Sequence, residues 1–346
     1  MGHGLRHPAD VVAWRRWHES RHAVRHAVRT ARARTRPGSP TRVDILTPEG
    51  GADVLVVVEA THASFAGAVG APLAHLPAQR TAIVTPVDWV PPLTYTRHRR
   101  STVDPAQIHL EVDPSVVLAT GHHTEVGSAV FAMAAASGSP FFVSQHGALT
   151  PFAPPLPAGA RLLAWSEADG DYWARGRPDI EVVPTGSQLL WEAAGRTPTA
   201  CPPDVQLTYL GQGHAAEISR GRLAHAALTT CRRHGAVYRP HPSERDITSR
   251  AVLAAYERAG ITVDRSASPL VDVAGPVVSV FSTGVLEAAA RGREAWVDFP
   301  RPPAWLGEFW ERYGMHSLGS DPTPSPPLPP REPARSVAAI VLDAVS

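Results

Sequence analysis

Short runs of apolar, largely β-branched residues recur along the chain, and longer segments with helical or turn character separate them. The first series covers residues 42–46, 53–58, 81–85, 116–119, 141–144 and 162–165, and the second covers 205–210, 236–239, 261–263, 277–281 and 295–299. Strands of parallel sheets are buried on both faces, so they read as continuous apolar runs that alternate with helices. The pattern therefore predicts two tandem α/β domains, each with a mostly parallel sheet.

A proline-rich stretch at 197–203 separates the two series. Near the N-terminus, apolar residues recur at helical spacing among arginines and histidines, which predicts a basic amphipathic helix. This helix either packs on the first domain or rests on an anionic membrane surface. The predicted divisions are a basic helix in 1–36, α/β domains in 37–200 and 201–330, and a C-terminal closing helix in 331–346.

The amino-acid composition limits which partners the protein can bind and in which cellular compartment we expect it. The net charge is +1 over 346 residues, so the chain has no global field for nucleic acid and we expect no such partner. All 33 basic residues are arginine, which with 35 prolines is typical of a high-GC coding bias. No apolar run approaches the roughly 20 residues that span a bilayer. Cys201 and Cys231 lack metal-ligand spacing, which favours a reducing, cytoplasmic location.

Loops after three runs of the second series carry anion-binding chemistry. His241 stands between two prolines, whose fixed φ angles hold the imidazole in one direction. The segment 282–284 opens a helix, and a helix N-terminus offers backbone N–H groups to an anion. Such loops suit a nucleotide diphosphate. The predicted nucleotide- and phosphate-binding residues are Gly211, Gln212, Arg239, His241, Ser282, Thr283, Gly284 and Glu287.

Several of these residues have a plainer interpretation that the sequence leaves open. The glycines around Gln212 are also what a simple turn requires, and His241 could cap a neighbouring helix. Glu287 either accepts hydrogen bonds from ribose hydroxyls or completes a capping box. The aromatic residues within 305–313 either shape an acceptor site or pack in a core, and core packing is the safer interpretation.

Two loops of the first series carry candidate histidines. His146 follows the run 141–144 beside a glycine, where it either acts as a general base or anchors the loop. After the run 116–119 come the acceptor-binding candidates His122, His123 and Glu125. Two adjacent histidines cannot face one metal ion from a strand, so acceptor binding or plain loop structure is favoured over a zinc site.

No metal or cofactor is required by these patterns. Asp169-Gly170-Asp171 matches a short acidic motif that binds divalent metal in some sugar transferases, but its surroundings predict the first turn of a helix. No glycine fingerprint of the dinucleotide or P-loop type follows any predicted strand. Hydride transfer and P-loop ATP hydrolysis therefore lose their main support.

The order of short motifs resembles two-domain transferases of the GT-B fold. Residues 143–147, 163–166 and 182–187 carry the likeness in the first domain, and 238–242 and 282–287 carry it in the second. The second-domain motifs look like those of the capsule and teichoic-acid branch, which includes CDP-glycerol glycerophosphotransferases and bacterial sialyl- and Kdo-transferases. This resemblance implies two Rossmann-like domains that face each other across a cleft.

The resemblance also implies roles for individual residues. In that family the His-Pro motif and a later hydroxyl pair bind the donor phosphate, which here correspond to His241, Ser282 and Thr283. The histidine of the Gln-His-Gly stretch resembles the catalytic base, here His146. This chain lacks the aspartate that precedes the later loop in the glycerophosphotransferases, and it lacks the Ser-Gly-Gly loop of the epimerases that act on UDP-N-acetylglucosamine.

The leading hypothesis is a metal-independent transferase that uses no cofactor. It would move a glycosyl or polyol-phosphate group from a CMP-, CDP- or UDP-linked donor to an acceptor hydroxyl, in the synthesis of a cell-surface polymer or glycoconjugate. A lipid-linked acceptor would place it at the inner membrane face. The alternatives are a nucleotide-sugar epimerase or hydrolase, and a non-catalytic GT-B scaffold that binds a nucleotide or a protein.

Overall fold

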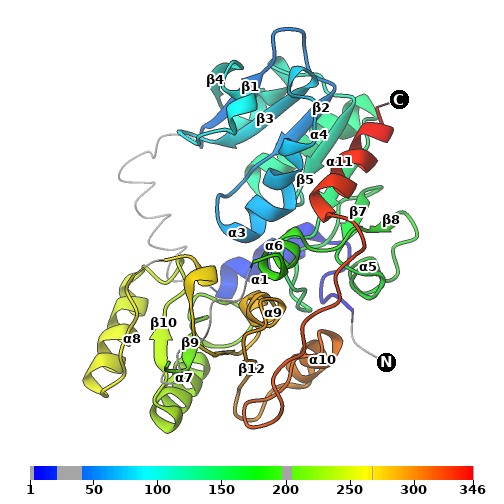
Figure 1. Ribbon diagram of the computed structural model, residues 1–346. Coiled ribbons are helices and arrows are strands. Elements are labelled where there is room, and N and C mark those ends of the chain that lie inside the picture. Colours follow the sequence, from blue (N-terminus) through cyan, green and yellow to red (C-terminus); the bar gives the residue numbers. More distant parts are fainter. Residues whose placement is uncertain (1–3, 22–40, 197–204, 267, 346) are drawn as a thin grey trace. The chain divides into compact units, whose positions relative to one another are not determined.

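The computed structural model describes residues 4–21, 41–196, 205–266 and 268–345, and its chain divides into two compact units (Figure 1). Of the described residues, the large-sheet unit contains 4–189 and 329–345. The small-sheet unit contains Leu190–Leu328. The division falls within helix α6 (Gln188–Ala194), and the proline-rich stretch around 200 lies mostly outside the described residues.

Eight strands form the large sheet among the residues that the structure describes. Their order across the sheet is β4 (Arg99–Val103), β1 (Val43–Thr47), β3 (Thr81–Pro86), β2 (Val54–Val57), β5 (Val116–Ala119), β6 (Phe141–Ser144), β7 (Arg161–Ala164) and β8 (Glu181–Pro184). β1 is antiparallel to both of its neighbours, and the other neighbours pair in parallel. The sequence pattern predicted all of these strands except β4 and β8. Those two lie at the edges of the sheet and are polar or partly exposed, so neither reads as an apolar run.

Both faces of the large sheet are covered, as the continuous apolar runs require. Leu55 and Val57 face a core that includes side chains of α4 and α5, whereas Val54 and Val56 face a core that includes side chains of η1, η2 and α11. The helical elements of this unit are α1 (Val11–Arg21), α3 (Ala63–Phe65), η1 (Ala66–Gly70), η2 (Ala71–Ala74), η3 (Ala78–Arg80), η4 (Leu93–Tyr95), η5 (Pro105–Leu110), α4 (Glu125–Ser137), α5 (Glu167–Trp173) and α11 (Pro333–Asp343). The closing helix, α11, is therefore part of the large-sheet unit.

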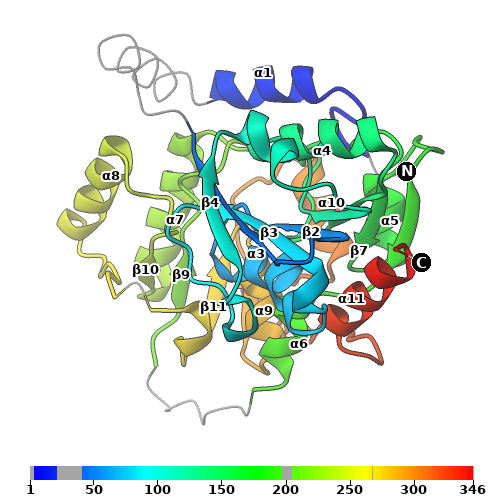
Figure 2. The ribbon, with the colours of Figure 1, turned by 90° about the horizontal axis from the view of Figure 1, so that it is seen from above.

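The basic N-terminal helix is present as α1; residues 4–10 precede it without helical structure, and residues 22–36 of the predicted span lie outside the described residues. Trp14 is buried, and its indole N–H donates to the carbonyl of Phe152 at 2.8 Å. Trp17 stacks on the Phe152 ring with 4.8 Å between ring centroids. Figure 2 shows α1 on the side of this unit that carries α4. The aromatic residues of α1 thus pack on the large-sheet unit.

Four parallel strands form the sheet of the small-sheet unit among the described residues, in the order β10 (Val237–Arg239), β9 (Thr208–Leu210), β11 (Val277–Ser279) and β12 (Ala295–Val297). Its other helical elements are α7 (Arg220–His234), α8 (Ile247–Arg258), η6 (Leu270–Asp272), α9 (Thr283–Ala290) and α10 (Ala304–Arg312). The predicted strand at 261–263 is wrong, because only Val263 pairs there, in a single bridge to Tyr238.

The fold class is therefore α/β, with a mostly parallel sheet in each of two units, as predicted. Each sheet also has a topological switch point, which is a place where the chain connections on the two sides of neighbouring strands run in opposite directions across the sheet. In the large sheet, β2 lies between β3 and β5; in the small sheet, β9 lies between β10 and β11. Open α/β sheets bind ligands outside the carboxyl ends of their strands at such points.

Candidate functional site

The loops that follow β9 and β11 are tied to each other at the switch point of the small sheet. Gln212 is 9% exposed, and its side-chain oxygen accepts the Phe281 N–H at 2.8 Å and the Ser279 hydroxyl at 3.2 Å. The predicted role of Gln212 was to reach a phosphate. Its amide oxygen is instead used to join the two loops, which leaves only the amide N–H₂ group for a ligand.

A residue that the sequence analysis did not assign joins the loops after β9 and β10. The carboxylate of Glu244 accepts the Gly213 N–H and the His241 N–H, each at 3.1 Å, and the Tyr238 hydroxyl at 2.9 Å. Only its place at the end of the His241 loop could have drawn attention to it, because its partners depend on how two distant loops fold together.

The imidazole of His241 has a defined tautomer and a defined neighbour. The Ser243 N–H donates to Nδ1 of His241 at 3.1 Å, so in the neutral ring the proton lies on Nε2, which is then a donor. The ring of His214 stacks on that of His241 with 3.8 Å between centroids and 18° between planes. These two contacts therefore fix the orientation of the His241 ring.

Gly211 and Gly213 are required by packing within the loops. A Cβ atom on Gly211 would collide with the Tyr238 hydroxyl and lie 2.8 Å from Oε1 of Glu244. A Cβ on Gly213 would lie 3.0 Å from Oε2 of Glu244. The two glycines thus make room for the side chains of Tyr238 and Glu244.

The Ser282 loop opens helix α9 as predicted. Ser282 is the N-cap, and its hydroxyl accepts the Gly284 N–H at 3.1 Å. Thr283 is the first helical residue. A Cβ on Gly284 would lie 2.7 Å from Leu270 and 2.9 Å from Leu210, so glycine is needed to pack this helix end.

Aromatic residues of α10 support the same loop from behind. The indole N–H of Trp310 donates to the Val280 carbonyl at 2.7 Å, and Trp305 contacts the Phe281 ring edge to face at 5.7 Å. Phe309 is fully buried. Of the two interpretations of this aromatic group, core packing is the one that the contacts show.

Glu287 is 6% exposed and lines a pocket with Leu270, Val273 and Arg291. Burial raises its pKa to about 7, while the charges of Arg291 and Arg196 lower that pKa and Glu192 raises it. With Ser282 as N-cap, Glu287 is the fifth helical residue, whereas a capping box needs the third. The capping-box interpretation is therefore wrong.

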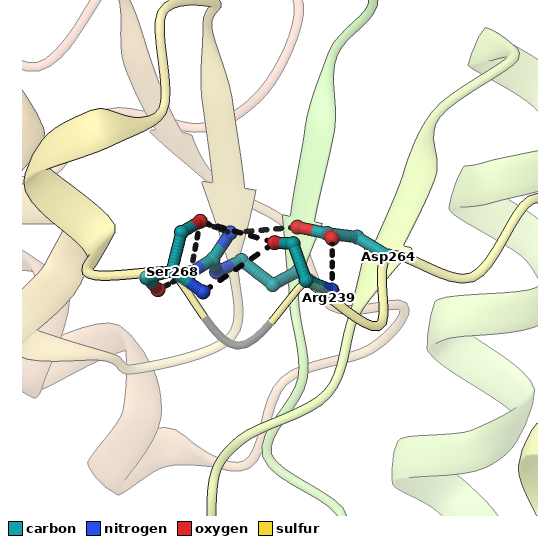
Figure 3. A network of polar contacts seen from close by, with 4 residues as sticks. Arg239, Asp264 and Ser268 are labelled. Atoms are coloured by element: carbon teal, nitrogen blue, oxygen red, sulfur yellow. Dashed lines mark hydrogen bonds and ion pairs between the residues drawn. The ribbon is translucent and has the colours of Figure 1, made fainter.

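Arg239 contacts a neighbouring loop within its own unit (Figure 3). Its guanidinium donates to Asp264 at 2.6 Å and to both the carbonyl and the hydroxyl of Ser268. Both terminal nitrogens of the guanidinium are thereby used within the protein. The structure thus gives Arg239, which was predicted to bind phosphate, contacts that hold Asp264 and Ser268 beside β10.

Glu59 lies at the switch point of the large sheet, immediately beyond β2. Its carboxylate accepts from the hydroxyls of Thr120, at 3.0 Å, and Thr124, which both lie beyond β5. Thr124 is also the N-cap of α4, and it accepts the Gly127 N–H at 2.9 Å. Burial raises the pKa of Glu59, and these hydrogen bonds lower it. An acidic residue directly after an apolar run was the signal in the sequence that could have identified it.

His122 and His123 lie together beyond β5, and α1 holds their backbone. Arg15 donates from Nε to the His123 carbonyl at 3.0 Å and from Nη2 to the His122 carbonyl at 3.1 Å. Burial is the main cause that lowers the pKa of His122 to about 4 and that of His123 to about 3. The Nδ1 atom of each is buried and has no hydrogen-bond partner among the described residues. Glu125, the third acceptor candidate, is exposed and accepts from the Thr41 hydroxyl at 2.7 Å.

His146 follows β6 and lies against aromatic rings. Its ring centroid is 4.3 Å from that of Phe65, which in turn stacks on His62 at 4.7 Å. Burial, and then the charge of His62, lower the pKa of His146 to about 4, so the imidazole is neutral near pH 7. Its Nδ1 atom is buried and has no hydrogen-bond partner among the described residues.

One predicted role for His146 was to anchor its loop, but the neighbouring residue Gln145 makes the anchoring hydrogen bonds. Its side-chain N–H donates to Asp169 at 3.0 Å, and its side-chain oxygen accepts the Trp165 N–H at 2.8 Å. His146 itself lines a pocket at the carboxyl ends of β6 and β7, together with Ser64, Ser144, Trp165, Gly186 and Ser187. The histidine is thus available to a ligand in that pocket.

Asp169 lies in the first turn of α5, where Ser166 is the N-cap, as predicted. Within the described ranges, no group of three or more histidine, cysteine, aspartate or glutamate side chains is arranged to hold a metal ion. In the same part of the chain, none of the helices has both the length and the apolar character needed to span a membrane.

Comparisons with known proteins give a distant structural likeness. No protein-family model matches the chain, and no curated protein matches it. A crystal structure of a glycosyltransferase from Rickettsia africae ESF-5 is similar with a TM-score of 0.41 and 11% identity, over 86% of this chain and 93% of that one. A likeness of this degree establishes neither family nor activity.

Proposed function

We propose that this protein is a metal-independent transferase that takes a glycosyl or polyol-phosphate group from a nucleotide-activated donor. The observation that carries the proposal is the convergence of three loops at the switch point of the small sheet. These loops follow β9, β10 and β11, and hydrogen bonds of Gln212 and Glu244 join them. Ligand binding at such a point is a general property of open α/β sheets.

The chemistry of these loops suits a diphosphate. The Nε2–H of His241 is a directed donor, and the N-terminus of α9, with Ser282 and Thr283, favours negative charge. Negative charge develops on the nucleotide as it departs. Donors that are already in position stabilise that charge without having to reorganise during the reaction.

The large-sheet unit supplies a base for the acceptor. His146 is neutral near pH 7 and can accept a proton from an acceptor hydroxyl. The acceptor oxygen would bond to the transferred group as the bond between that group and the nucleotide breaks. The electron pair would leave with the nucleotide, and the proton would pass to His146. The buried nitrogens of His122 and His123 offer further partners for acceptor hydroxyls.

The proposal includes a cellular setting. The resemblance to capsule and teichoic-acid transferases supports a cell-surface polymer or glycoconjugate as product, a lipid-linked acceptor, and a site of action at the cytoplasmic membrane face. Contact of α1 with anionic lipid would use its exposed residues, because Trp14 and Trp17 already pack on the large-sheet unit. Sedimentation with anionic liposomes, with and without residues 1–36, tests this part.

The first experiment is a thermal-shift panel with CMP, CDP, UDP, UMP and GDP. We expect one nucleotide to stabilise the wild-type protein and to lose that effect in His241→Ala. His234→Ala, at the exposed end of α7, is the matched control. If no nucleotide stabilises the wild type, the donor site and the catalytic roles are withdrawn.

Donor turnover then separates the enzyme classes. A transferase consumes donor only when an acceptor is present, whereas an epimerase or hydrolase consumes it alone. Nucleotide binding without turnover under any acceptor would indicate a non-catalytic scaffold.

A further inference from the structure

Glu244 has no role in the proposed reaction, yet its carboxylate joins the loops after β9 and β10. It is 6% exposed and lies just before α8. Its carboxylate accepts from one hydroxyl and two main-chain N–H groups, and the two N–H groups belong to different loops. A buried carboxylate needs such partners, because leaving it without them would cost several kcal/mol.

Glu244 is not a member of a simple ion pair. Arg220, whose charge lowers the pKa of Glu244, makes a two-pronged contact with Asp246 at 2.8 and 2.9 Å. Burial raises the pKa of Glu244, while the hydrogen bonds from Tyr238, His241 and Gly213 lower it. The carboxylate therefore faces neutral N–H and O–H donors, whose bonds are directional.

These contacts determine where two imidazoles point. Oε1 of Glu244 accepts both the His241 N–H and the Gly213 N–H, so one oxygen holds the main chain at His241 and next to His214. The rings of these two histidines then stack on each other. The glycines at 211 and 213 leave the space that Glu244 and Tyr238 fill.

We propose that Glu244 is the positioning residue of the donor site. It touches no ligand, and it fixes the loops after β9 and β10 so that the Nε2–H of His241 is directed at the donor phosphate. This inference rests on the proposed function for the ligand. The positioning itself is a property of the protein without ligand, and it is tested separately.

The test compares Glu244→Ala and Glu244→Gln in the full chain. The glutamine oxygen can still accept both N–H groups, so Glu244→Gln is the conservative variant. In Glu244→Ala we expect amide exchange in 211–215 and 240–245 to accelerate at least about tenfold, and affinity for the stabilising nucleotide to fall at least about tenfold. In Glu244→Gln we expect both quantities to stay within about threefold of wild type.

Two controls separate positioning from general destabilisation. Glu257→Ala removes an exposed glutamate of α8, which pairs with Arg265, and should change neither quantity. Leu253→Ala removes buried volume from the same helix and should lower the melting temperature while nucleotide affinity stays at the wild-type value. A loss of affinity in Leu253→Ala equal to that in Glu244→Ala would overturn the positioning role.

The remaining outcomes are also decisive. Unchanged amide exchange in both loops of Glu244→Ala overturns the inference whether or not a nucleotide binds. Faster exchange with unchanged affinity overturns it as well, because the loops would then not serve the donor. If the wild-type protein binds no nucleotide, the proposed function fails. Amide exchange alone then decides whether Glu244 fixes the positions of the loops after β9 and β10.

Discussion

The two switch points have the same topology and opposite chemistry. At the small sheet, side chains such as Gln212 and Glu244 join the loops, and the His241 ring presents an N–H donor. At the large sheet, three imidazoles keep buried nitrogens that have no hydrogen-bond partner among the described residues, and burial keeps the rings neutral. Under the proposed function, the loops of the small sheet would bind an anion and those of the large sheet an uncharged hydroxyl. Four predictions test that difference.

His146→Ala tests the large-sheet crevice most directly. Loss of a general base typically lowers turnover by about 10²–10⁴. We expect that loss in donor consumption with acceptor present, while nucleotide affinity remains unchanged. His109→Ala, in the exposed part of η5 of the same unit, is the control. Wild-type turnover in His146→Ala would remove the histidine from the mechanism.

The two units should respond to pH with opposite sign. The pKa of His146 and that of His122 are lowered from 6.5 to about 4, so the stability that they contribute is present above about 6.5 and is lost as the pH falls toward 4. The pKa of Glu287 is raised from 4.5 to about 7, so its contribution is present below about 4.5 and is lost as the pH rises through 7.

Amide exchange at pH 5 and pH 7, corrected for the intrinsic rate and resolved by peptide, measures this contrast. Acidification should weaken protection in the large-sheet unit and strengthen it in the small-sheet unit, each on the order of 2 kcal/mol. Glu287→Gln should flatten the response of the small-sheet unit. A response of the same sign in both units contradicts the assigned pKa shifts.

Gly211→Ala tests how tightly the small-sheet loops are packed. The added methyl group would meet the Tyr238 hydroxyl and Glu244, so we expect a loss of about 1–3 kcal/mol in the free energy of unfolding. Gly221→Ala is the matched control, because a methyl group there, in helix α7, meets nothing within 4 Å. That control should stabilise the protein by about 0.5–1 kcal/mol. Chemical denaturation measures the free energy of unfolding of both variants. Equal changes would show that the loops can accommodate an added methyl group at Gly211.

Ser282→Ala removes a helix cap at the small-sheet crevice. The cap is worth about 1 kcal/mol of stability, and loss of the hydroxyl should also weaken nucleotide binding several-fold. Ser219, the N-cap of α7, makes no side-chain capping hydrogen bond, so Ser219→Ala should change little. Calorimetric titration and thermal unfolding give the two quantities. Comparable losses of stability and nucleotide affinity in Ser282→Ala and Ser219→Ala would mean that the Ser282 hydroxyl has no special role in capping or binding.

The sequence predicted most of the fold because buried parallel strands leave a clear trace. Apolar runs identified β2, β5 and β6 with both faces buried, and the helix start at Ser282 followed from residue types alone. The polar edge strands β4 and β8 left no such trace. Periodicity reports burial, and edge strands are only partly buried.

The candidate site was predicted in outline, and its internal contacts were not. His241 and His146 could be identified from their positions after apolar runs. The partners of Arg239 could not, because Asp264 lies 25 residues further along the chain and Ser268 lies 29. Glu244 was not predicted for the same reason, because its hydrogen bonds include one from Gly213 in a different loop. Contacts between distant loops follow from tertiary packing rather than from local residue types.

The place of α11 has a consequence for how the chain is made. One core of the large-sheet unit is completed by Val337, Ala338 and Val341 of α11. The large-sheet unit is therefore built from two separate segments of the chain, and the small-sheet unit is synthesised between them. The small-sheet unit is continuous and can finish folding once Leu328 has left the ribosome. The large-sheet unit starts first and finishes last, and the part of its core that α11 covers stays exposed until that helix has been synthesised. Chaperone dependence during translation should therefore be greatest for the half of the protein that is synthesised earliest.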